Sequence, residues 1–83
     1  MNKVCVIVET PAICRKDDML LPDYLPIELL KKLIADAVKE LSIGAFEPTG
    51  NELLCRREDG IILNPCYTLS DYCVTDGMHL ILF

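Results

Sequence analysis

Cysteine and histidine are residue types whose spacing can indicate a metal site or a catalytic nucleophile. The five cysteines are Cys5, Cys14, Cys55, Cys66 and Cys73. No two of them have the Cys-x-x-Cys spacing of zinc sites and redox motifs. Unpaired cysteines in odd number are typical of a reducing compartment, and we expect these to be small buried side chains. Only Cys14, beside Arg15 and Lys16, has neighbours that would favour a reactive thiolate.

The motifs of common enzyme classes are missing from the sequence. There is no glycine-rich phosphate loop, no GxSxG and no HExxH, and the one histidine, His79, has no carboxylate at an informative spacing. Arg56 and Arg57 could bind an anion, but Glu58 and Asp59 follow them directly and favour ion pairs instead. We therefore predict no enzymatic activity, no metal and no cofactor.

Composition restricts the class of partner. The chain has 83 residues, 52% of them hydrophobic, and a formal net charge of −5, so one domain spanning residues 1–83 is expected. The acidic balance opposes binding to nucleic acid or anionic lipid. The apolar runs are far shorter than a bilayer requires, and Glu9 interrupts the one run that resembles a secretory leader. We expect a cytoplasmic protein without membrane insertion, whose surplus apolar residues face a protein partner.

Hydrophobic patterning predicts a hairpin followed by one helix. Residues Lys3–Glu9 have the β-branched character of a strand, Thr10–Asp18 are expected to be a polar loop, and Met19–Leu21 would pair back. The pattern then changes to a helical period, with Pro26 at the first helical position and Gly44 as the stop. The expected buried stripe is formed by Ile27, Leu30, Leu33, Ile34, Ala37, Val38 and Leu41.

The second half of the sequence predicts short strands joined by turns. Leu53–Arg57 and Ile61–Leu63 form a hairpin around the Asp59–Gly60 turn signal. Thr68 and Asp71 have capping-box spacing for one tight turn. Met78–Phe83 alternate as a final strand. The expected order is strand, strand, helix, strand, strand, short turn, strand.

This order resembles the ubiquitin-like β-grasp, an α+β fold with a mixed sheet of four to five strands and one helix packed on one face. TLSDY at Thr68–Tyr72 and HLIL at His79–Leu82 look like the corresponding stretches of ubiquitin. DYLPIELLKKLIADAVKELSI at Asp23–Ile43 is similar to the small YukD-like proteins of bacterial type VII secretion systems. The resemblance implies a cytosolic accessory or regulatory component that acts by binding, in which the Tyr72 hydroxyl ties a loop to the backbone.

The resemblance also leaves an alternative function. Modifiers and sulfur carriers of this fold need a flexible Gly-Gly tail, whereas this sequence stops at Phe83 within its last expected strand. We therefore expect a non-conjugated protein; the alternative is a modifier or carrier whose tail is lost or missing from this chain. Expected partners are cytoplasmic parts of the secretion machinery, or a second copy in a homodimer.

The expected binding site is the face of the sheet that the helix leaves open. If the even-numbered valines of the first strand pack on the helix, Cys5 and Ile7 point outward, as do His79 and Ile81 in the last strand. One of Leu53 and Leu54 should also be outside. We predict a protein-binding surface of Cys5, Ile7, Leu54, Arg56, His79 and Ile81. A register shifted by one residue would exchange the inward and outward sets, and a mildly apolar monomer without a partner is the simpler interpretation.

Overall fold

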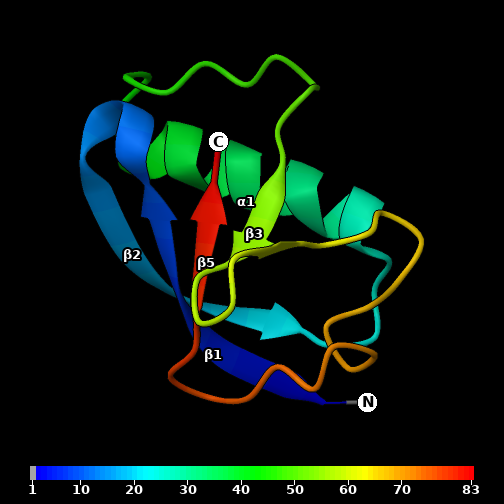
Figure 1. Ribbon diagram of the computed structural model, residues 1–83. Coiled ribbons are helices and arrows are strands. Elements are labelled where there is room, and N and C mark those ends of the chain that lie inside the picture. The colour runs from blue at the N-terminus through cyan, green and yellow to red at the C-terminus, as the bar shows by residue number, and fades with distance from the viewer. Residues whose placement is uncertain (1) are drawn as a thin grey trace.

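A computed structural model describes residues 2–83 and shows one helix lying across one face of a five-stranded sheet (Figure 1). The helix α1 spans Ile27–Leu41. The strands are β1 (Lys3–Thr10), β2 (Arg15–Pro22), β3 (Leu54–Arg56), β4 (Ile61–Ile62) and β5 (His79–Leu82). The order along the chain is the predicted one.

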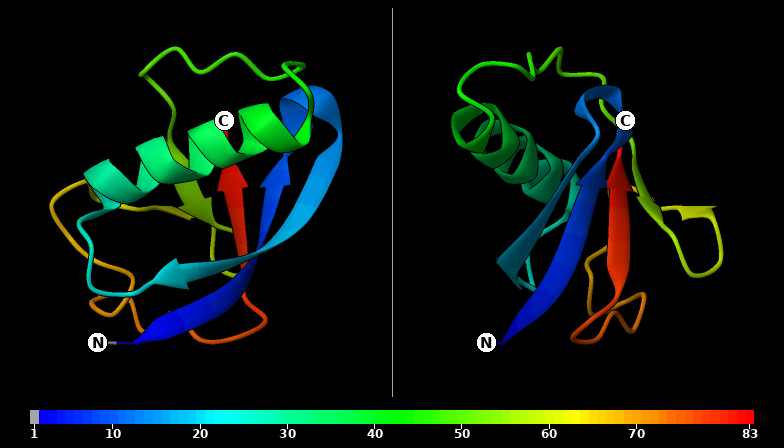
Figure 2. Two further views of the ribbon diagram at one scale, coloured as in Figure 1. Left: turned by 180° about the vertical axis from the view of Figure 1, so that it is seen from behind. Right: turned by 90° about the vertical axis from the view of Figure 1, so that its left-hand side faces the viewer.

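The sheet is mixed, in the strand order β2-β1-β5-β3-β4. β1 is antiparallel to β2 and parallel to β5, while β3 is antiparallel to both β5 and β4. Figure 2 shows α1 on one side of this sheet, and residues 2–83 place no helix on the other. The predicted β-grasp architecture is therefore confirmed, and one face of the sheet is left without a covering layer.

The first hairpin is longer than the sequence pattern predicted. Thr10–Asp18 was expected to be a loop, but β1 continues to Thr10 and β2 already begins at Arg15. Only a 3-10 turn at Pro11–Ile13 separates them, closed by Cys14 at a φ of 51°. Charged residues near the turn are compatible with strand structure because their side chains reach solvent while their backbones complete the ladder.

The helix begins and ends close to the predicted residues. Pro26 is not its first residue but precedes it, and its carbonyl accepts the amides of Leu29 and Leu30 at 3.0 Å. The Ile27 amide, at the start of the helix, donates to the Tyr67 carbonyl at 2.7 Å. The segment after β4 therefore takes the place of a side-chain cap. After Leu41 the chain turns away through positive φ angles at Ile43 and Gly44.

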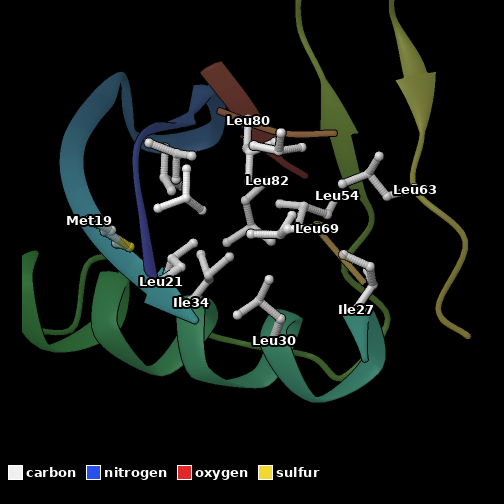
Figure 3. Packing of buried hydrophobic residues seen from close by; sticks show 14 of the residues in the cluster. Met19, Leu21, Ile27, Leu30, Ile34, Leu54, Leu63, Leu69, Leu80 and Leu82 are labelled. Carbon is white, nitrogen blue, oxygen red and sulfur yellow. The ribbon is translucent and has the colours of Figure 1, made fainter. Parts of the chain in front are cut away.

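The core lies between α1 and the inner face of the sheet (Figure 3). The even-numbered residues Val4, Val6 and Val8 are buried there, which confirms the predicted register of β1. The prediction that Leu33 and Leu41 belong to the buried stripe was wrong, because they are 51% and 49% exposed. They lie on the flank of the helix, which the sheet does not cover.

The segment between β4 and β5 is fixed by hydrogen bonds rather than by regular structure. The Thr68 amide donates to Asp71 Oδ2 at 2.9 Å and the Asp71 amide donates to Thr68 Oγ1 at 3.1 Å, as the capping-box spacing predicted. The Tyr72 hydroxyl accepts the Asn64 amide at 2.8 Å, which confirms that it ties a loop to the backbone. This segment closes one end of the core.

Candidate protein-binding face

The face of the sheet opposite α1 is formed by alternate residues of the strands, and we call it the open face. Its members follow from the burial of their neighbours on the helix side and from the strand register. β1 and β2 contribute Cys5, Ile7, Glu9, Lys16, Asp18 and Leu20. The chain around β3, β4 and β5 contributes Leu53, Cys55, Arg57, Ile62, His79, Ile81 and Phe83.

Four of the six predicted binding residues lie on this face. Ile7 of β1 is directly opposite His79 of β5, and Ile81 follows two residues later on the same side. Cys5 is exposed, while the other three are partly buried among their neighbours. The structure therefore brings Cys5, Ile7, His79 and Ile81 together as predicted; that they bind a protein stays a prediction.

Leu54 is not on the open face, and its placement there was wrong. It is opposite Leu82 in the β3–β5 pair and is completely buried in the core. Its neighbour Cys55, opposite Ile81, occupies the outward position instead. The sequence could not settle this register because Leu53, Leu54 and Cys55 are consecutive apolar residues that fit either face.

Arg56 also points to the helix side of the sheet, because it is opposite the buried Leu80. Its guanidinium donates to both Asp59 and the Tyr72 carbonyl. The hydrogen bond from Arg56 holds the pKa of the Asp59 carboxyl below its ordinary value. Arg56 thus stabilises the β3–β4 turn by the expected ion pair, and it was wrongly included in the predicted surface.

An ionic bridge across the open face was not predicted. Arg57 Nη1 lies 3.0 Å from one oxygen of Glu9, and Lys16 Nζ lies 3.9 Å from the other. Because Arg57 follows β3 and Glu9 lies on β1, with β5 between them, the bridge spans the middle of the sheet. The Glu9 side chain is only 15% exposed. Its two-residue spacing from Ile7 was the signal that could have placed it here.

His79 is fixed beside this bridge by Glu58. The His79 amide donates to Glu58 Oε2 at 3.0 Å, and the ring Nδ1 lies 3.3 Å from the same oxygen. Partial burial alone would raise the pKa of the Glu58 carboxyl, but the hydrogen bonds from His79 outweigh it and lower the pKa. His79 therefore has a fixed orientation in the centre of the open face.

An apolar patch borders the bridge. Leu53, Cys55, Ile62, Ile81 and Phe83 lie on β3, β4 and β5 or at their ends, on the same side. Three of these side chains are about half exposed: Leu53, Ile62 and Phe83. This combination of an apolar area and an adjacent charged group is typical of protein interfaces.

The cysteines are distributed differently from the sequence-based expectation. Only Cys55 is buried, whereas Cys5, Cys14, Cys66 and Cys73 are exposed, and all five are free thiols. Cys14 lines a shallow open hollow at the end of the first hairpin, together with Glu9, Pro11, Arg15 and Lys16. The four exposed cysteines are therefore not the small core residues that were expected.

None of the helical structure within residues 2–83 combines the length and the apolar character that crossing a bilayer demands.

Solved structures with similar folds include domains of secretion proteins. The ubiquitin-like domain of the Mycobacterium tuberculosis type VII secretion system protein ECCD1 is 23% identical, with a TM-score of 0.79 over 99% of this chain and 98% of that domain. A chain of the MycP5-free ESX-5 inner membrane complex is 26% identical, with a TM-score of 0.74. This match covers 100% of the present chain but only 21% of that longer chain. Caldiarchaeum subterraneum ubiquitin shares the fold at 13% identity and a TM-score of 0.74, covering 98% of this chain and 91% of that one.

A comparison with curated proteins gave no significant match. The model of a protein family, described as WXG100 protein secretion system (Wss), protein YukD, matches residues 5–82. This match includes all five strands that form the open face, apart from the first two residues of β1. The chain therefore belongs to the YukD family of the WXG100 protein secretion system.

Proposed function

We propose that this protein is a non-conjugated interaction module, an accessory or regulatory component of a type VII secretion system that binds a cytoplasmic segment of the secretion machinery. Family membership and the likeness to the ECCD1 domain and to part of an ESX-5 inner membrane complex support this setting. The observation that carries the proposal is the apolar patch beside the Lys16–Glu9–Arg57 bridge, on a sheet face without a covering layer.

The chemistry of the face indicates what the partner presents. The apolar patch favours a partner with exposed aliphatic or aromatic side chains, because burying them removes apolar surface from water. The bridge brings two cations to one carboxylate, so a partner carboxylate beside Arg57 or Lys16 would gain a charge-assisted hydrogen bond. We propose that Ile7, Ile62, His79, Ile81 and Arg57 contact the partner.

The test is binding of purified cytoplasmic segments of the secretion machinery to isotope-labelled protein, followed by amide chemical shifts. We expect shifts concentrated on β1, β3, β4 and β5. Ile81→Asp and Ile62→Asp should each weaken binding by about tenfold or more, because each inserts a charge into an apolar contact. Both variants should keep the amide dispersion of the folded protein.

Ile61→Asp is the matched control. Ile61 is about half exposed, like Ile62, but lies opposite Arg56, on the other side of the sheet, so the same substitution there should leave the affinity unchanged. Equal weakening by Ile61→Asp and Ile62→Asp, or binding that survives both open-face variants, would contradict the proposal. If Ile81→Asp unfolds the chain, Ile62, which is half exposed, still decides the outcome.

A further inference from the structure

The outer edge of β2 has backbone groups available for another strand. β2 is the first strand in the sheet order and pairs only with β1. In β1, the Ile7 amide donates to Met78 on the β5 side at 3.0 Å, so Val6 and Val8 direct their backbone groups toward β2. The backbone groups of their partners Met19 and Asp17 therefore form hydrogen bonds with β1.

The residues between these partners must therefore direct their N–H and C=O groups away from the sheet. They are Lys16, Asp18 and Leu20, all exposed. Within residues 2–83, none of their backbone groups has a partner outside the β1–β2 ladder. This free edge is long enough to form hydrogen bonds with one further strand.

The charges on this edge are complementary to themselves. Lys16 and Asp18 are two residues apart, so both side chains project from the open face. If a second β2 runs antiparallel about a two-fold axis through Asp17, Lys16 lies opposite Asp18 of the second copy, and Asp18 lies opposite its Lys16. Each pair also exchanges two backbone hydrogen bonds, since both residues have outward groups.

The residue on the axis is already neutralised within each chain. Asp17 would face Asp17 of the second copy, and two unpaired carboxylates at this position would repel each other. However, Arg15 Nε donates to Asp17 Oδ2 at 2.8 Å. The axis would therefore be flanked by two ion pairs rather than by two isolated negative charges.

The end of α1 offers apolar surface on the helix side of the sheet. Figures 1 and 2 show its C-terminal turn at the same end of the molecule as the β1–β2 turn, where β2 begins. Leu41 is half exposed there, and Ile43 is 95% exposed at a φ of 54°. A β-branched residue in this conformation is strained, and in a single chain its side chain gains no packing in return.

We propose that two copies of this chain pair antiparallel through β2, joining two five-stranded sheets into one of ten strands. Both helices then lie on one side, with the exposed Leu41 and Ile43 at the C-terminal end of each. Both open faces lie on the other side, available to the same partner. The pairing uses the edge of the sheet and does not depend on the function proposed for the apolar patch.

Sedimentation of the full chain from about 1 µM to about 1 mM tests the pairing, because this range covers weak and moderate dimers. We expect the native chain to dimerise as its concentration rises. Lys16→Asp and Asp18→Lys should each weaken dimerisation by about tenfold or more, because each places like charges opposite one another twice. An equimolar mixture of the two variants should dimerise again, since their charges are then complementary.

Lys32→Asp is the matched control, since it makes the same charge change at an exposed site on α1 and should leave dimerisation unchanged. Amide exchange supplies a second measurement: the amides of Lys16 and Asp18 should be protected only in the dimer. A native chain that stays monomeric over the whole range overturns the proposal. So does a mixture that fails to restore the dimer, or a dimer in which these amides exchange freely.

Lys16 lies close to Glu9, so Lys16→Asp could disturb the fold. In that case the test is whether the native chain dimerises and whether Asp18→Lys weakens that dimer by about tenfold or more.

Discussion

Leu53 and Leu54 are adjacent in the chain but lie in opposite environments. Leu54 is in the core opposite Leu82, while Leu53, the residue just before β3, is 42% exposed. Truncating a buried leucine removes apolar contacts and leaves a cavity, whereas truncating a half-exposed one does little of either. The two residues therefore provide an internal comparison of the two faces of β3.

We expect Leu54→Ala to lower the free energy of unfolding by about 2–5 kcal/mol, and Leu53→Ala by less than about 1 kcal/mol. Urea denaturation followed by circular dichroism measures both values. Similar losses for the two variants, or a larger loss for Leu53→Ala, would show that the register of β3 against β5 is wrong.

The same pair shows where residue-level prediction from sequence stops. Alternation predicted that Ile7, His79 and Ile81 share one face but left open which face it is. The burial of their neighbours Val6, Val8 and Leu80 shows that the register chosen was the right one. Leu53–Cys55 has no polar residue to fix it, so only pairing with β5 decides which side chain is inside. The Glu9–Arg57 contact joins residues 48 positions apart, and local pattern carries no information about such a contact.

At the scale of elements, the end of α1 is conformationally costly. Gly44 has a φ of 81° and its amide donates to the Lys39 carbonyl at 2.9 Å, as expected of a glycine that ends a helix. Ile43 adopts a similar φ without the freedom of glycine. Strain of this kind persists where the surrounding structure or a function requires it.

Ile43→Gly should therefore raise the free energy of unfolding of the monomer by about 1 kcal/mol through relief of the strained backbone. If pairing through β2 buries Ile43, the same variant should weaken dimerisation. Gly44→Ala is the control, because its added methyl meets open space but its φ is unfavourable, and it should be destabilising. Thermal unfolding at low concentration measures the first effect and sedimentation measures the second; a less stable Ile43→Gly monomer would contradict the assignment of strain.

Elements were predictable where one period dominates. The bounds of α1 follow from its apolar spacing and from Pro26 and Gly44. The sequence pattern missed the first half of β2 because the charged residues Arg15–Asp18 are typical of a polar turn. Only their pairing with β1 shows that they form a strand. Leu33 and Leu41 satisfy the helical period yet remain outside, because the width of the sheet, not the helix, sets how much of α1 is covered.

For the whole molecule, several carboxylates are held by hydrogen bonds that disappear on unfolding. In Glu52 and Glu58, partial burial acts to raise the pKa, but amide donors of Thr49 and Gly50 in one case and of His79 in the other lower it overall. In Asp59 the hydrogen bond from Arg56 lowers the pKa. The folded chain therefore binds fewer protons than the unfolded chain in mildly acidic solution.

Acidification should therefore destabilise the fold. Because these folded-state pKa values lie below the unfolded ones, the stabilisation is complete above about pH 5 and is lost as the pH falls through about 4 and below. We expect the urea midpoint to fall between pH 5 and pH 3, and Glu58→Gln to fall less steeply because Gln cannot titrate. Both should be measured at low protein concentration so that pairing through β2 does not contribute. A midpoint that rises on acidification, or an equal slope in Glu58→Gln, would show that the contact between Glu58 and His79 does not stabilise the fold.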